Sequence, residues 1–335
     1  MKILVTGSCG HLGEALMRVL PEEGHEAVGL DLVPSTYTTH VGSITDRSLV
    51  RRAMVGVDAV MHTATLHKPH VATHSRQAFV DTNVTGTMTL LEAAVEAGVR
   101  AFIFTSTTSA FGRALSAGAG EPAAWITESV GPVPKNIYGV TKTAAEDLCQ
   151  LVHQLHGLPV VVLRTSRFFP EEDDSRATRA AWSEPNAKAN EYLYRRVDLV
   201  DVVTAHLAAL DRAPALGFAR YIISATTPFD RADTADLRDD APSVVARYFP
   251  DCEALYAAAG WTMFPGLDRV YDNRAAREEL GWRPEYDFAR ILDQMRAGQP
   301  VGGELAREVG IKRYHAQVFD DGPYPVATAS TEEDR

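Results

Sequence analysis

Cysteine is scarce in this sequence, and its scarcity excludes a fold held together by disulfides. The 335 residues include three cysteines, Cys9, Cys149 and Cys252, which lie far apart in the chain. Their spacing matches neither a disulfide framework nor a zinc site. We therefore expect a protein of a reducing compartment and predict that it is cytoplasmic.

Long hydrophobic runs and an excess of positive charge are missing as well. No apolar run approaches the roughly 20 residues that a transmembrane helix needs, and the N-terminal residues have the pattern of a core strand without a signal-peptide cleavage region. Lys and Arg number 33 against 44 Asp and Glu, for a formal net charge of -11. We therefore expect neither a membrane nor a nucleic acid as a partner.

A glycine-rich turn near the N-terminus is the most informative feature that is present. Residues 2–6 form an apolar strand pattern, residues 7–13 read GSCGHLG, and an amphipathic helix pattern follows. Gly7 permits a tight strand-to-helix turn, Gly10 lets the backbone approach a pyrophosphate, and Gly13 lets the helix pack closely on the sheet. This arrangement predicts a dinucleotide-binding site.

The end of the second predicted strand indicates which dinucleotide is bound. Residues 26–31 have a strand pattern that ends at Asp31, where a carboxylate can accept hydrogen bonds from an adenosine ribose. Residues 32–36 contain no Arg or Lys that could attract a ribose phosphate. NAD is therefore favoured over NADP.

The rest of the chain alternates strands and helices, which predicts an α/β fold: a Rossmann-type doubly wound parallel sheet with a smaller C-terminal substrate-binding lobe. Further strands are expected at 58–62, 100–105, 159–164 and 219–224, and a helix at 77–97 that ends at Gly98. From about Pro228 the pattern changes to short helices and loops.

These patterns divide the chain into three regions. Residues 1–165 are expected to form an NAD-binding domain with the catalytic residues, and residues 166–327 a mixed region that completes the sheet and forms the substrate lobe. Residues 328–335 are polar and are expected to be disordered. The segment 311–325 before this tail is rich in aromatic residues, which suggests that it packs on the lobe.

Two neighbouring patterns indicate redox chemistry. Tyr138 and Lys142 are four residues apart, so they share one face of a helix, and an ammonium nearby should lower the pKa of the phenol. The hydroxyl-rich stretch 105–109 follows the predicted strand at 100–105, at the sheet edge where such folds bind ligands. A hydroxyl there can hold a substrate oxygen while the tyrosine takes or returns its proton.

Taken together, these motifs resemble the extended short-chain dehydrogenases/reductases, the group of nucleotide-sugar epimerases and dehydratases. The likeness runs from Lys2 to about Phe288 and is carried by residues 6–13, 83–87, 138–142 and 280–284. The resemblance implies that Tyr138 is the acid/base, that Lys142 orients the nicotinamide ribose, and that Thr107 is the catalytic hydroxyl.

The same resemblance, added to the motifs, gives a full set of expected contacts. Cofactor contacts are expected from Gly7, Cys9, Gly10, His11, Leu12, Gly13, Asp31, Ser43, Ile44, Thr63, Ala64, Asn83, Thr105, Tyr138 and Lys142. Substrate contacts are expected from His67, Thr108, Ser109 and Arg167.

Departures from the group's pattern bear on the substrate. Arg167 stands where similar epimerases carry Asn, Ser43 stands where the group often has Asp, and the segment after residue 167 is short. These features favour an NAD-dependent dehydrogenase of a free sugar or sugar acid, with Arg167 either gripping a carboxylate or paired with the acidic run 171–174. The alternatives are a nucleotide-sugar 4-epimerase or dehydratase with retained NAD, and a non-catalytic NAD-binding regulator.

Two further features carry expectations. His62, His67, His70 and His74 invite a metal hypothesis, but Pro69 interrupts them and no carboxylate or thiol ligands accompany them, so we expect no metal and assign His67 and His70 to a substrate-side loop. The helices at 77–97 and 136–156 resemble the pair through which the group dimerises, which implies a homodimer.

Overall fold

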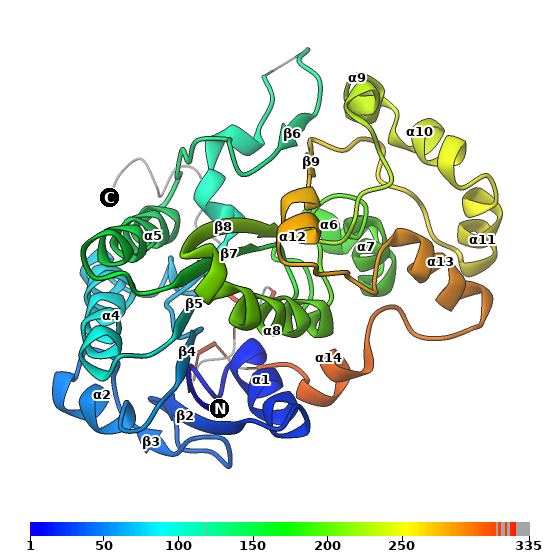
Figure 1. Cartoon of the computed structure of the whole chain (residues 1–335). Helices are drawn as coiled ribbons and strands as arrows, with labels where there is room; N and C mark the ends of the chain where they lie inside the picture. The colour runs from blue at the N-terminus through cyan, green and yellow to red at the C-terminus, as the bar shows by residue number, and fades with distance from the viewer. Residues whose placement is uncertain (119, 313, 316–318, 320–321, 326–335) are drawn as a thin grey trace.

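The computed structural model describes residues 1–118, 120–312, 314–315, 319 and 322–325 (Figure 1). Its centre is a seven-stranded sheet in which every neighbouring pair is parallel. In spatial order the strands are β3 (His40–Val41), β2 (Glu26–Asp31), β1 (Lys2–Thr6), β4 (Ala59–His62), β5 (Ala101–Thr107), β7 (Val160–Thr165) and β8 (Phe218–Ile223). The predicted Rossmann-type sheet is confirmed.

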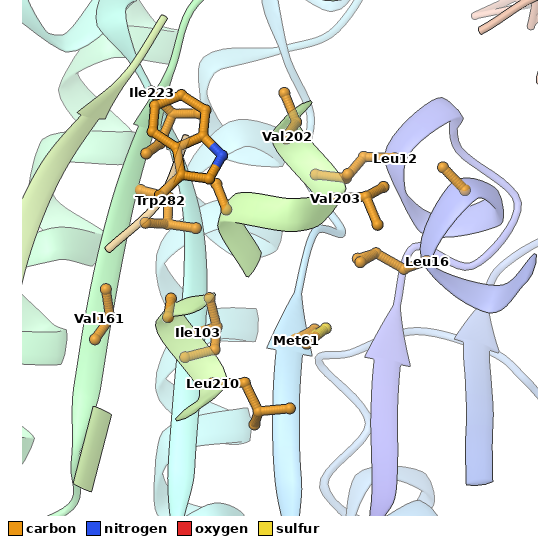
Figure 2. Packing of buried hydrophobic residues seen from close by; sticks show 14 of the residues in the cluster. Leu12, Leu16, Met61, Ile103, Val161, Val202, Val203, Leu210, Ile223 and Trp282 are labelled. Atoms are coloured by element: carbon orange, nitrogen blue, oxygen red, sulfur yellow. The ribbon is translucent and has the colours of Figure 1, made fainter. Parts of the chain in front are cut away.

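Helices cover both faces of this sheet because its strands alternate apolar side chains between the faces. On one face, Ile3 and Val5 pack with α1 (His11–Glu22) and α8 (Leu199–Leu216). Figure 2 shows residues of α1 and α8 meeting Met61, Ile103 and Val161 of the strands. On the other face, Leu4 packs with α2 (Arg47–Ala53), α4 (Gly86–Ala97) and α5 (Ile137–His156).

A smaller lobe stands beside the sheet, built from the short elements expected after Pro228 and from two earlier segments. It has its own core of buried residues, among them Leu193, Phe229 and Phe288. Its helices are α6 (Arg176–Ala181), α7 (Glu184–Glu191), α9 (Thr234–Asp239), α10 (Ala241–Tyr248), α11 (Cys252–Ala259) and α13 (Phe288–Arg296), with the 3-10 turn η5 (Arg231–Asp233). The strands β6 (Ala124–Ile126) and β9 (Arg269–Tyr271) form a separate parallel pair.

The remaining elements connect these parts. They are α12 (Arg274–Glu279), α14 (Glu304–Val309) and the 3-10 turns η1 (Lys68–His70), η3 (Thr108–Phe111) and η4 (Arg113–Leu115). Within the part of the chain that the structure describes, every helix is too short or too polar to cross a membrane. The tail at 328–335, expected to be disordered, lies outside the described residues.

One predicted helix differs from the structure. Instead of a continuous helix at 77–97, the chain forms α3 (Arg76–Phe79), the π-helical turn η2 (Val80–Thr85) and then α4. The wider turn contains Asn83, whose amide donates to Leu66 O at 2.8 Å and to Thr141 Oγ1 at 3.0 Å. Gly98 ends α4 in the left-handed conformation at φ +67°, as the helix-stop signal predicts.

Candidate active site

The carboxyl ends of the central strands meet at one edge of the sheet, where the strand order reverses between β1 and β4. Folds of this kind bind ligands in the crevice at such a point. A cavity of about 590 Å³ lies there and is lined by the residues that follow β1, β2, β4, β5 and β7. The fold therefore brings the separate sequence motifs to one place.

The glycine-rich turn has the geometry that its sequence predicts. Gly7 adopts φ +74°, and a Cβ at Gly13 would lie 1.9 Å from the Gly7 carbonyl oxygen, so both positions require glycine. Among the described residues other than its two chain neighbours, the one heavy atom within 4 Å of a Cβ added at Gly10 is the Gly7 oxygen, at 3.3 Å. The open side of Gly10 thus leaves room for a ligand to approach the backbone, as a pyrophosphate would require.

Asp31 lies at the end of β2 beside this turn. Its Oδ2 accepts a hydrogen bond from Cys9 N at 2.9 Å, and its Oδ1 accepts one from Val33 N at 3.0 Å. The carboxylate lines the cavity together with Ser43 and Ile44. An acidic group fixed at this place fits the ribose of a dinucleotide and repels a ribose phosphate.

Most of the predicted site residues line the same cavity. These are Gly7, Cys9, Gly10, His11, Leu12, Gly13, Asp31, Ser43, Ile44, Thr63, Ala64, His67, Thr105, Thr107, Thr108, Ser109, Tyr138 and Arg167. Two residues lie behind its wall. Asn83 and Lys142 are each 2% exposed, and their side-chain polar atoms form hydrogen bonds with other groups of the chain.

Tyr138 and Thr107 form the centre of the site. Thr107 ends β5, and its Oγ1 accepts a hydrogen bond from Ser109 N at 3.1 Å. Burial raises the pKa of Tyr138 to about 12, while its hydrogen bond with Thr107 lowers the pKa in part. The expectation that Lys142 lowers this pKa is therefore wrong for the structure, because desolvation of the phenolate dominates.

Lys142 is held under the site by α5. Its amine donates to Thr105 O at 2.6 Å and lies 3.9 Å from the centre of the Phe104 ring. Burial lowers the pKa of Lys142 to about 7, although Glu146 one turn away opposes this shift. The amine is positioned by the carbonyl of Thr105, near the end of β5.

His67, a predicted substrate-binding residue, has its ring in contact with the ring of Tyr138. The two ring centroids are 6.5 Å apart, and His67 also packs on Phe169 at 5.4 Å. Burial holds the pKa of His67 well below its usual range, so the imidazole is neutral. It can donate or accept a hydrogen bond with a substrate hydroxyl.

Arg167 lines the cavity but is surrounded by carboxylates of its own chain. Its guanidinium lies 3.6 Å from Asp173, 3.5 Å from Asp174 and 3.9 Å from Glu191, and it donates to Glu172 O at 2.9 Å. The alternative in which Arg167 pairs with the acidic run describes this arrangement. Its charge is balanced without a substrate carboxylate.

The histidines of the metal hypothesis have other roles. His62 shares hydrogen bonds with Thr6 Oγ1 at 2.7 Å and Thr87 Oγ1 at 3.0 Å, which ties β1 to α4. His70 accepts a hydrogen bond from His67 N at 3.1 Å. Among the described residues, no group of three or more His, Cys, Asp and Glu side chains is arranged to hold a metal ion.

Several lining residues were not among the predicted site residues. Arg195 follows α7, Arg269 and Tyr271 belong to β9, and Lys312, Tyr314 and Tyr324 come from the aromatic segment near the C-terminus. The density of aromatic residues at 311–325 was the signal for the last group. It indicated packing on the lobe but did not indicate that the segment reaches the cavity.

Comparisons with known proteins agree with this geometry. The family model of the NAD dependent epimerase/dehydratase family matches residues 3–217. A UDP-glucose 4-epimerase of Streptomyces lividans is 32% identical over 347 residues, covering 90% of this chain and 98% of its own. A 3 beta-hydroxysteroid dehydrogenase/Delta 5-->4-isomerase of Mycobacterium tuberculosis is 28% identical over 338 residues, covering 88% and 89%.

A solved structure shows the same fold. The short-chain dehydrogenase/reductase superfamily protein of Agrobacterium tumefaciens, crystallised with bound NAD, superposes with a TM-score of 0.65 at 24% identity, covering 92% of this chain and 97% of its own. With the family model matching most of the chain and the Streptomyces relative matching nearly its full length, the protein belongs to the NAD-dependent epimerase/dehydratase family of enzymes.

Proposed function

We propose that the protein is a nucleotide-sugar 4-epimerase that retains NAD. The observation that carries the proposal is the placement of Tyr138 and Thr107 in the same cavity as the glycine turn and Asp31. The near full-length likeness to a UDP-glucose 4-epimerase supports the substrate class. The cavity also extends to Arg195 and Arg269, but Arg195 is paired with Asp173 and Glu191 and Arg269 with Asp268, so the proposal does not rest on their charge.

The comparisons support this alternative better than the dehydrogenase of a free sugar or sugar acid that the short segment after β7 favours. The balanced charge of Arg167 also disfavours a sugar-acid substrate, because a guanidinium already surrounded by three carboxylates gains little from a substrate carboxylate. A dehydrogenase that releases NADH stays the second candidate, since its chemistry needs the same residues.

The residues of the chain can perform both halves of an epimerisation. Bound at the glycine turn and Asp31, NAD would supply the hydride acceptor and donor for the substrate carbon. Thr107 positions the substrate hydroxyl. Tyr138 is the acid/base: in its phenolate form it accepts the hydroxyl proton as the carbonyl forms, and it then gives the proton back. Lys142 holds the end of β5 through Thr105 O and is the family's candidate for the nicotinamide ribose. His67 can hold a hydroxyl of the sugar.

The decisive experiment separates the three functions that share this fold. Purified protein is mixed with UDP-glucose, with UDP-galactose, and with NAD plus free sugars or sugar acids. We expect interconversion of the two nucleotide sugars without net NADH. Net NADH with a free sugar or sugar acid would instead establish the dehydrogenase, and NAD binding without any turnover would favour the non-catalytic regulator.

Assembly, location and domain division remain proposals of the same kind. We propose a homodimer through α4 and α5, because Val140, Leu151 and Leu155 of α5 are exposed apolar residues, 50%, 44% and 67% accessible.

A cytoplasmic location is supported by the unpaired state of all three cysteines. The division at residue 165 is supported by β8, which completes the sheet from the second region.

A further inference from the structure

A few residues near the C-terminus lie against the candidate site although they are far from it in sequence. They are Lys312, Tyr314, His315 and Tyr324, which we call the C-terminal strap. Lys312, Tyr314 and Tyr324 line the cavity that also holds the glycine turn and Tyr138. The strap is therefore part of the wall of the active site and not only of the lobe.

The first attachment of the strap is to the turn that begins α1. Lys312 N lies 3.2 Å from His11 Nε2, and its amine forms an ion pair with the carboxylate of Glu14. His11 directly follows Gly10, at the helix end where a pyrophosphate would bind. The strap thus covers the end of the helix that faces the dinucleotide.

The second attachment is to the loop after β7. Lys312 N also lies 3.2 Å from Glu171 Oε1, and the same oxygen lies 2.8 Å from His11 Nε2. The hydroxyl of Tyr314 bonds to the Glu171 carboxylate as well. Glu171 is 4% exposed, so it joins the strap, α1 and the loop after β7 in one buried cluster.

The third attachment is to the loop after β4. The ring centroid of Tyr314 lies 4.9 Å from that of His67, which in turn contacts Tyr138, and His315 Nε2 shares a hydrogen bond with Pro69 O at 3.0 Å. His315 also packs against His70 at 5.3 Å. The strap consequently bridges three of the chain segments that surround the cavity.

We propose that the C-terminal strap retains the dinucleotide between turnovers, with Lys312 and Tyr314 as the residues that set its release rate. A ligand held between α1 and the loops after β4 and β7 can leave only when these segments separate, and the strap ties them together. The inference rests on the proposed function, because an epimerase must return the hydride from the cofactor that received it. It adds a retention role for a segment outside the family's motifs.

Exchange of bound NAD tests the proposal without reference to turnover. Full-length protein loaded with NAD is mixed with excess radiolabelled NAD, and the exchange rate is measured for Lys312→Met, Tyr314→Ala and both together. We expect each single variant to exchange several times faster than wild type and the double variant at least tenfold faster. Tyr314→Phe, which removes only the hydroxyl bond to Glu171, is expected to show a smaller acceleration.

Arg18→Met is the matched control. Arg18 donates to the same Glu14 carboxylate, at 2.8 Å and 3.0 Å, but from within α1. Its loss should leave the exchange rate at the wild-type value. Equal acceleration by Arg18→Met and Lys312→Met would trace the effect to Glu14 and overturn the role of the strap, as would unchanged exchange in the double variant.

The melting temperature of each variant separates retention from misfolding. A strap variant that melts like the wild type and exchanges faster supports the proposal, and Tyr314→Phe keeps the test valid if the alanine variant does not fold. The outcome for the proposed function is independent. If the strap variants exchange NAD faster but the protein does not interconvert nucleotide sugars, the epimerase proposal is rejected and the retention role of the strap stands. If the protein epimerises nucleotide sugars but the strap variants exchange NAD at the wild-type rate, the retention role is rejected and the epimerase proposal stands.

Discussion

At the scale of single residues, Tyr138 is the group on which the proposed chemistry depends. Tyr138→Phe should lower kcat by a factor on the order of 10² to 10⁴, because the proton transfer at the substrate oxygen loses its acid/base. NAD binding should be retained, since the ring still fills its buried position. The measurement is the turnover of the nucleotide sugar, with Tyr248→Phe as the control because Tyr248 bonds to Asp233 in the lobe. Unchanged turnover would remove Tyr138 from its assigned role.

The proposed preference for NAD rests on Asp31. Asp31→Asn preserves the shape of the side chain and can still accept one of the hydrogen bonds from Cys9 N and Val33 N. The loss of charge should weaken NAD binding by about tenfold, or roughly 1.4 kcal/mol, and should weaken NADP binding less or improve it, because the repulsion of the ribose phosphate is removed. Calorimetric titration with both dinucleotides measures this, and equal losses would refute the ribose assignment.

Local motifs predicted most of the site because each of them is short and continuous. The glycine turn, Asp31 and the spacing of Tyr138 and Lys142 can be read from a few neighbouring residues. The acidic run beside Arg167 could also be read in this way, but the contact of Arg167 with Glu191 and the pKa of Tyr138 could not. They depend on burial and on carboxylates such as Glu191, which only the folded chain brings close.

At the scale of elements, α5 is joined to the sheet by a buried ion pair behind Lys142. Glu146 accepts hydrogen bonds from Arg164 Nη2 at 2.7 Å and from Ser106 Oγ at 2.5 Å, and both members of the pair are at most 3% exposed. Glu146→Leu leaves Arg164 as an unpaired buried charge. The free energy of unfolding in urea should therefore fall by about 3 to 5 kcal/mol.

Two companion variants identify the cause of that loss. Glu96→Leu removes an ion pair with Arg51 that is more than half exposed, and it should cost less than about 1 kcal/mol. Adding Arg164→Met to Glu146→Leu should recover part of the stability, because the unpaired charge is removed. A double variant no more stable than the single one would show that the pair acts through packing instead.

Most of the elements that sequence patterns missed are very short. β3 has two residues, and β6 and β9 have three each, too few for an alternation of apolar and polar residues to be recognised. The π turn at Val80–Thr85 interrupts a helical pattern without changing its composition. Its position follows from the contacts of Asn83 with the loop after β4, which are not local in sequence.

At the scale of the whole molecule, the cavity depends on parts of the chain that lie far apart. Tyr138 comes from α5, Arg269 from β9 and Tyr314 from the strap. The doubly wound parallel sheet could be predicted from the alternation of strands and helices, whereas the position of Lys312 could not. That position depends on its contacts with Glu171 and His11, which are more than 100 residues away in the sequence.

The contact of α8 with the lobe predicts a pH dependence of stability. Asp201 on α8 is buried, and its carboxylate accepts hydrogen bonds from Glu285 N at 2.7 Å and Tyr286 N at 2.9 Å. Burial raises the pKa of Asp201 to about 7, although these two bonds lower it in part. The folded state therefore binds a proton that the unfolded state, with a pKa of about 3.9, releases.

The sign and the pH window follow from these values. The contribution of Asp201 to stability is fully present below about pH 4 and is lost as the pH rises through about 7. Asp201→Asn cannot titrate, so the difference in unfolding free energy between wild type and variant should fall by up to about 4 kcal/mol from pH 4 to pH 8. His62, His67, His70 and His206 have lowered pKa values and oppose this trend, but they are common to both proteins and cancel in the difference. Urea unfolding at several pH values measures the two curves, and parallel curves would show that Asp201 is ionised throughout and that its hydrogen bonds outweigh its burial.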